Sequence, residues 1–183
     1  PLISSLLFLS VLSLAIGNER GEVLGFPFIS FLAPGLIAMS IIQQSFSHSS
    51  SSLMIGKIQG IIIDNLLAPL SAIEVTLAII LAAVTRSIVI TIISIVVFSL
   101  IIEIHIYNIF YIFIFAFLGS FILGALGFIA GLWAEKIDHM ATVTNFIITP
   151  LSFLSGVFYS IERLPVFFRS ISQINPFFYM IDG

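Results

Sequence analysis

The stretch IHIYNIFYIFIFAFLGSFILGALGFIAGLWA, residues 104–134, contains no Asp, Glu, Lys or Arg. It is longer than the ~20 apolar residues that a helix needs to cross the ~30 Å hydrocarbon core of a bilayer. Similar runs recur along the 183 residues, which are 60% hydrophobic and 8% charged, with a mean hydropathy of +1.25. Because a water-soluble domain could not bury so much apolar surface, the sequence predicts an all-α polytopic membrane protein.

Five apolar runs fit membrane-spanning helices in one transmembrane domain over residues 1–183. The runs are continuous rather than alternating with a period of two residues, which disfavours transmembrane strands. The chain begins without a Met and stops directly after a turn-like Asp-Gly pair, so we expect a domain truncated at both ends. The expected spans are approximately 1–16, 28–46, 77–102, 109–134 and 141–159.

The charged and metal-binding residue types exclude several functions. The net charge of −3 is small and scattered, which argues against a nucleic-acid partner. The chain has no cysteine, so disulfides and thiolate metal sites are excluded. His48, His105 and His139 lack the spacing of metal ligands, and we predict neither a metal site nor a catalytic residue. Lys and Arg fall equally on the two sides of the predicted spans, so charge alone does not orient the chain.

The segment 57–74, between the second and third predicted spans, begins with KIQGIIIDNLL (57–67). On a helical wheel the Ile and Leu side chains form one face, and a narrow polar strip consists of Lys57, Gly60 and Asp64. We expect Pro69 to end this helix, because its ring clashes with the preceding turn. Two interpretations stay open: a helix that lies in the membrane interface, or a docking element for a cytoplasmic partner.

The Gly56–Lys57 pair does not belong to a nucleotide-binding loop. That loop requires another Gly five residues before the Gly of the pair, and a Ser or Thr after the Lys. Ser51 and Ile58 occupy these two positions. ATP binding by this route is therefore excluded.

Three features of the later sequence concern helix packing and the membrane interface. Arg86 is the only basic residue inside a predicted span; it is either a snorkelling anchor near the helix end or part of a substrate path or subunit contact. Gly127 and Gly131 have the GxxxG spacing that lets another helix approach closely in lipid, and we interpret them as helix-packing residues. The apolar segment 164–174, which begins with Pro165 near its first turn, predicts a short interfacial helix.

Read in order, several segments resemble the permease subunit of type-2 ABC transporters, the class that contains bacterial drug, lipid and nodulation-oligosaccharide exporters. They cover most of the chain, and the last is the most specific. The segments are FLAPGLIAMS (31–40), GKIQGIIIDNLLAPLSAIEV (56–75), AAVTRSIVI (82–90), GFIAGLWAEKIDHM (127–140) and NFIITPLSFLSGVFYSIERLP (145–165), which continues to INPFFYMIDG (174–183).

This resemblance implies the transmembrane domain of a type-2 ABC exporter, with five of an expected six spans present. It implies that segment 57–74 is cytoplasmic and that helix 164–174 is extracytoplasmic. The ATPase-subunit contact that it implies consists of Lys57, Gln59, Gly60, Asp64 and Glu74. It also matches Arg86 to a recurring basic position early in the third span.

The same resemblance implies a multi-pass subunit of a homodimer in the bacterial inner membrane, in contact with lipid. ATP and Mg would be bound by the partner ABC ATPase subunit, and this chain would hold no cofactor. The exported substrate would be amphipathic, lipid-like, drug-like or an oligosaccharide.

Two other classes of function stay open. An ion-coupled secondary carrier commonly places charges or broken helices at the bilayer midplane, whereas these spans contain almost no ionisable residues. A membrane-embedded enzyme would need clustered acidic or histidine residues near the interface, and the sequence shows no such cluster.

Overall fold

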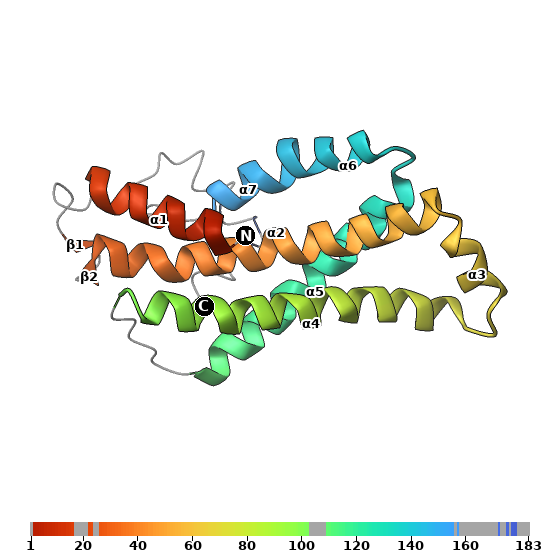
Figure 1. The fold of residues 1–183 in the computed structure, drawn as a ribbon, viewed down its shortest axis with the longest axis horizontal. Helices are drawn as coiled ribbons and strands as arrows, with labels where there is room; N and C mark the ends of the chain where they lie inside the picture. The colour runs from red at the N-terminus through yellow and green to blue at the C-terminus, as the bar shows by residue number, and fades with distance from the viewer. Residues whose placement is uncertain are drawn as a thin grey trace.

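The computed structural model describes residues 2–16, 22–23, 26–102, 109–155, 157, 172, 175 and 177–178. This part of the chain is mainly helical, with one two-stranded antiparallel hairpin; α2 and α4 run along the long axis of the molecule and α5 crosses them obliquely (Figure 1). The predicted all-α class is therefore confirmed. The elements are α1 (Leu2–Ile16), β1 (Glu22–Val23), β2 (Phe26–Pro27), α2 (Phe28–Ile58), α3 (Ile61–Leu67), α4 (Ala72–Ser99), α5 (Ile109–Trp133), α6 (Ile137–Val143), the π-helical turn η1 (Thr144–Ile148) and α7 (Thr149–Phe153).

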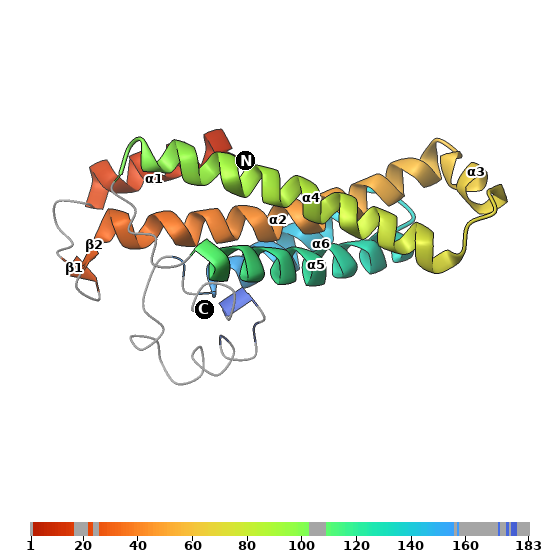
Figure 2. The same ribbon diagram turned by 90° about the horizontal axis from the view of Figure 1, so that it is seen from below.

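Helix α2 is the central element of the bundle. Figures 1 and 2 show it running along the molecule with α1, α4 and α5 packed against it. In the most apolar part of each helix, 61% of the α2 residues are buried, against 33% in α4 and 28% in α5. The helix with the lowest hydropathy of the three is thus the one that its neighbours shield from the surroundings.

Helix α2 does not end at Phe46, where we expected the second span to stop. Its 31 residues continue to Ile58 through the serine cluster, residues 45–52 (SFSHSSSS), and measure ~46 Å at 1.5 Å per residue. Serine is a weak helix former because its hydroxyl competes for backbone hydrogen bonds. Two hydroxyls of this stretch have partners: Ser45 Oγ lies 2.6 Å from Ser87 Oγ of α4, and Ser50 Oγ donates to the Ser47 carbonyl. The buried Ser49 hydroxyl has no hydrogen-bond partner among the described residues.

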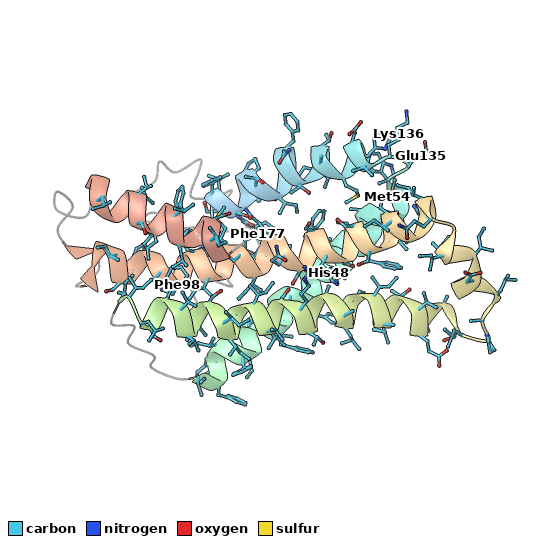
Figure 3. The ribbon with its side chains drawn as sticks, in the orientation of Figure 1. His48, Met54, Phe98, Glu135, Lys136 and Phe177 are labelled. Carbon is cyan, nitrogen blue, oxygen red and sulfur yellow. The ribbon has the colours of Figure 1, made fainter. Side chains whose placement is uncertain are left out.

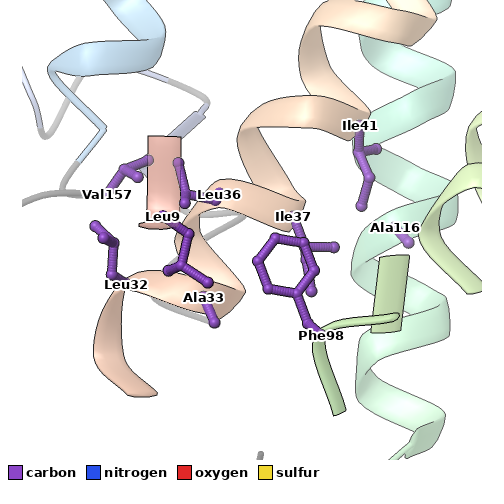
Figure 4. Packing of buried hydrophobic residues seen from close by; sticks show 9 residues of the cluster. All are labelled: Leu9, Leu32, Ala33, Leu36, Ile37, Ile41, Phe98, Ala116 and Val157. Atoms are coloured by element: carbon purple, nitrogen blue, oxygen red, sulfur yellow. The ribbon is translucent and has the colours of Figure 1, made fainter. Parts of the chain in front are cut away.

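Two buried hydrophobic clusters follow α2 along its length. The first joins α1, α2, α4 and α5. Figure 4 shows its α2 members, Leu32 to Ile41, together with Leu9, Phe98, Ala116 and Val157 from other parts of the chain. Phe98 of α4 is fully buried in it, and Val157 packs from the segment after α7. The second cluster brings α6 and the π-helical turn onto α2 and α5, and consists of Ile42, Phe46, Met54, Leu123, Ala134, Met140, Ile148 and Phe177.

The connection between α2 and α4 is not the single helix from Lys57 that the sequence predicted. Gly60 has a φ of 77°, a left-handed conformation that interrupts the helix. Helix α3 therefore starts at Ile61, and Lys57 is left in the last turn of α2. Helix α4 starts at Ala72, before the predicted 77, because Ser71 and Glu74 form a capping box.

The last helical segment, 137–153, contains a π-helical turn in place of a uniform α-helix. Pro150 has no backbone N–H to donate to the preceding turn, and the Thr149 N–H bonds to the Thr144 carbonyl five residues back. Such widened turns accommodate a missing bond without breaking the helix. The predicted range 141–159 thus begins inside a helix that starts at Ile137. Residues 156 and 158–159 lie outside the described residues, as does the predicted helix 164–174 apart from Ser172.

Three helices of the described part are long and apolar enough to cross a membrane: Ile29–Ile58, Ala72–Ser99 and Ile109–Trp133. A shorter apolar helix covers Ile3–Leu12. The first predicted span falls on this short helix, and the fifth falls on α6, the π-helical turn and α7. The structure therefore supports three spans by length, and the count of five stays a prediction.

Candidate functional site

Charged side chains gather at the end of the bundle where α3 lies. Apart from Glu22 and Arg86, every charged residue that the structure describes lies at this end, on α3, on the flanking ends of α2 and α4, or near the start of α6. Figure 1 shows α3 and the α5–α6 connection at the same end of the long axis, and Figure 3 labels Glu135 and Lys136 there. We call this the α3 end.

Lys57 connects two helices at the α3 end. Its ammonium group donates to three carbonyl oxygens at the C-terminus of α5: Gly131 at 2.7 Å, Leu132 at 2.6 Å and Ala134 at 3.1 Å. The last carbonyls of a helix have no partner within the helix, and a cation there is favoured by the helix dipole. Lys57 thus ties the end of α2 to the end of α5 and leaves its charge engaged within the chain.

Glu74 is likewise engaged within the chain. Its carboxylate accepts hydrogen bonds from the Ser71 N–H at 2.7 Å and from the Ser71 hydroxyl at 2.8 Å, and the Ser71 hydroxyl accepts from the Glu74 N–H at 3.3 Å. This reciprocal arrangement fixes the first turn of α4. The pattern Ser-x-x-Glu could have been recognised in the sequence before the helix was seen.

The other three residues of the predicted contact lie on or beside α3. Gly60 forms the turn between α2 and α3, and Gln59 and Asp64 are exposed. Large apolar side chains surround them: Ile58, Ile61, Ile63, Leu67, Leu70 and Ile73 are all exposed. The surface around α3 therefore combines a few polar groups with a wide apolar rim. This composition suits either a protein partner or the membrane interface.

The two glycines of the GxxxG pattern face the backbone of α2. A Cβ atom added at Gly127 would collide with the Phe46 carbonyl oxygen and lie 3.0 Å from the Phe46 Cα. At Gly131 it would lie 3.0 Å from the Ser50 carbonyl oxygen. Phe46 and Ser50 are also four residues apart, so each pair lies on one face of its helix. The two helices therefore run in the same direction along this close contact.

Arg86 lies inside α4, and the structure gives it a partner that the sequence did not suggest. Its Nη1 lies 3.1 Å from His48 Nδ1 on α2 and donates to it. The next residue, Ser87, is the one that bonds to Ser45 of α2. Neither residue pair has a recognisable sequence spacing, because the two helices meet only in the fold.

The described residues contain no group of three or more His, Asp or Glu side chains that could hold a metal ion. Their geometry offers helix contacts and a mixed polar and apolar surface at the α3 end.

Comparison with known proteins identifies the family. The chain matches the ABC-2 type transporter family over residues 1–183. It is 29% identical over 183 residues to the inner membrane transport permease YadH of Escherichia coli K12, covering 100% of this chain and 72% of that protein. The YadH permease of Shigella flexneri matches with the same identity and coverage. No solved structure matches the chain. The chain therefore belongs to the ABC-2 type transporter family, as its sequence resemblance predicted.

Proposed function

We propose that this ABC-2 permease subunit exports an amphipathic, lipid-like, drug-like or oligosaccharide substrate across the bacterial inner membrane. In this proposal it works as a homodimer with a separate ABC ATPase subunit, which binds ATP and Mg. The permease role follows from the family, whose members lack an ATPase domain, and the chain has no nucleotide-binding loop of its own. Energy must therefore enter through contact with a partner.

The observation that carries the proposal is the concentration of charge at the α3 end, with exposed Gln59 and Asp64 surrounded by exposed apolar side chains. Exposed apolar side chains of this kind mark interaction surfaces on proteins, and the polar groups of Gln59 and Asp64 can supply the hydrogen bonds that an interface needs. We assign the ATPase contact to α3 and its flanking turns. Lys57 and Glu74, which the resemblance includes in the same contact, support this surface indirectly, because Lys57 bonds to the end of α5 and Glu74 caps the start of α4.

The connections of α3 suggest how a push from the ATPase would reach the spans. Helix α3 lies between α2 and α4 in the chain, so a displacement of α3 acts on both helices. Lys57 extends this linkage to α5 through three charge-assisted hydrogen bonds. All three long apolar helices are therefore joined to the proposed contact.

An ion-coupled carrier is the weaker alternative. Such carriers need ionisable groups or broken helices near the midplane. Within the interiors of the three long apolar helices, the structure describes one arginine and one histidine, and no carboxylate deeper than Glu74 in the first turn of α4.

Replacing Asp64 with Lys reverses a charge on the proposed contact and tests the assignment. The full-length permease is reconstituted with its ATPase, and subunit association, substrate-stimulated ATP hydrolysis and export are measured. We expect weaker association or hydrolysis uncoupled from export, with normal membrane insertion. Ser99→Lys is the control, because Ser99 is exposed at the opposite end of α4. Wild-type behaviour of Asp64→Lys in all three measurements would leave α3 as an interfacial anchor only.

A further inference from the structure

The pair formed by Arg86 and His48 lies within the helices, away from the charged α3 end. Arg86 is twelve residues along α4 from Glu74, ~18 Å at 1.5 Å per residue, and His48 is nine residues, ~14 Å, before Lys57 on α2. Figure 3 shows His48 between α2 and α4, toward the middle of the long axis. We propose that this pair binds the anionic head group, a phosphate or carboxylate, of an amphipathic substrate.

The first argument is the charge of Arg86. A guanidinium has five N–H donors and no acceptor, and the interaction that the structure gives it uses one donor on a neutral acceptor, His48 Nδ1. No described Asp or Glu forms an ion pair with Arg86; the described carboxylates of Asp64, Glu74, Glu135 and Asp138 all belong to the α3 end. Ionisable groups within a span face the bundle interior or a water-filled cavity and are paired, and a guanidinium is bound most strongly by a carboxylate or phosphate. The missing anion is therefore expected to come from outside the described chain.

The second argument is where the arginine lies on its helix. Arg86 is exposed although it is in the middle of α4, and His48 is only partly buried. The pair is thus open to the outside of this subunit, where a substrate or a lipid can reach it. Arginine is suited to phosphates and carboxylates because its planar fork can donate two parallel hydrogen bonds to one group.

The third argument is the surroundings of the pair. Gln44, Ser51 and Ser52 are four residues before and three and four residues after His48, so they share its face of α2 and are partly or fully exposed. Their amide and hydroxyl groups can bond the remaining oxygens of a head group. On α4, the exposed Val89 and Ile93 follow Arg86 on the same face. A polar head at Arg86 would leave an apolar tail along these two side chains.

The inference rests on the proposed function, because it takes the ligand of the pair to be the exported substrate. Binding can nevertheless be measured without the ATPase. The full-length permease in the uncharged detergent dodecyl maltoside is titrated with dodecyl phosphate or with inorganic phosphate. Native mass spectrometry counts the molecules bound, and the uncharged detergent competes for any site that recognises only the tail.

We expect Arg86→Gln to raise the half-saturating dodecyl phosphate concentration at least ~10-fold, the effect of losing a charge-assisted contact. His48→Gln should weaken binding less, because it leaves the charge in place. The control Lys136→Gln removes an exposed cation at the α3 end and should bind like wild type. If Arg86→Gln does not fold, Arg86→Lys replaces it and is expected to weaken binding while retaining part of it.

Each outcome decides the proposal. Dodecyl phosphate binding that depends on Arg86 supports an anion site. If inorganic phosphate also binds and depends on Arg86, the head group alone is recognised. If inorganic phosphate does not bind, the site recognises the whole amphiphile. Equal binding by wild type and the Arg86 variants, or equal losses in the Arg86 and Lys136 variants, overturns the site. If the site stands but the ATPase neither associates with the permease nor drives export, the proposed function fails alone.

Discussion

The close contact between α5 and α2 predicts a graded response to alanine at four glycines. At Gly127 a Cβ would collide with the backbone oxygen of Phe46, and backbone cannot rotate away as a side chain can. At Gly131 the nearest atom is the Ser50 carbonyl oxygen at 3.0 Å, and at Gly124 it is Ile80 Cγ2 at 3.4 Å, which is ordinary contact. Gly56 has nothing within 4 Å of the added atom.

The size of each effect follows from two opposing terms. Alanine is favoured over glycine inside a helix by about 1 kcal/mol, whereas overpacking a tight contact costs about 1–3 kcal/mol and more against backbone. Gly56→Ala receives only the favourable term and should stabilise by up to ~1 kcal/mol. Gly124→Ala should be near neutral and Gly131→Ala mildly destabilising. Gly127→Ala should lower the free energy of unfolding by about 2 kcal/mol, which corresponds to a decrease of ~4–8 °C in Tm for a chain of this size.

Thermal unfolding in detergent, followed by far-UV circular dichroism, measures the series under one set of conditions. The expected order of stability is Gly56→Ala, Gly124→Ala, Gly131→Ala and then Gly127→Ala. Leucine at Gly127 or Gly131 should be worse than alanine at the same position. A Gly127→Ala protein as stable as the Gly56→Ala protein would refute the reasoning, because the α2–α5 backbone contact would then not be present.

Two further predictions concern the ends of the helices. Lys57→Met keeps the apolar stem of the side chain but removes the hydrogen bonds to the α5 carbonyls. We expect the free energy of unfolding to fall by about 1–2 kcal/mol after allowance for solvent screening, which lowers the Tm. The Tm of Lys57→Arg should be closer to that of the wild type. An unchanged Tm for Lys57→Met would show that the bonds add no stability. Single cysteines at the exposed positions Ser71 and Ser99, at opposite ends of α4, should react with a membrane-impermeant thiol reagent from opposite sides of the membrane, Ser71 from the cytoplasm. Labelling of both from one side would mean that α4 does not cross.

The features that could be predicted from the sequence are those encoded by continuous apolar runs. Residues 109–134 contain no charged side chain, and helix α5 occupies Ile109–Trp133. The spacing of Gly127 and Gly131 indicated a helix-packing face, and the structure places both against the backbone of α2. A GxxxG pattern indicates close approach because it depends on local spacing within one helix.

The features that could not be predicted depend on contacts between distant residues. The serine cluster has the composition of a span end, since serine is polar and a weak helix former. It is nevertheless helical, because Ser45 and Ser50 are buried against α4 and α5, which the local sequence does not reveal. Lys57 looked like the first residue of an amphipathic helix, yet the positive φ of Gly60 separates it from α3. Its carbonyl partners lie more than 70 residues later in the chain, beyond any local pattern.

Cross-linking between the permease and its ATPase subunit tests the central claim most directly. The sequence has no cysteine, so a single cysteine can be placed in this region at Asp64 on α3, or at Ser99 at the other end of α4 as the control. The assembled complex in native membranes is treated with a short thiol-to-amine cross-linker, and products containing both subunits are identified by mass. We predict that Asp64→Cys joins the permease to the ATPase and that Ser99→Cys does not. Cross-linking from Ser99→Cys alone, or from neither position in a complex that hydrolyses ATP, would contradict an ATPase docked on α3.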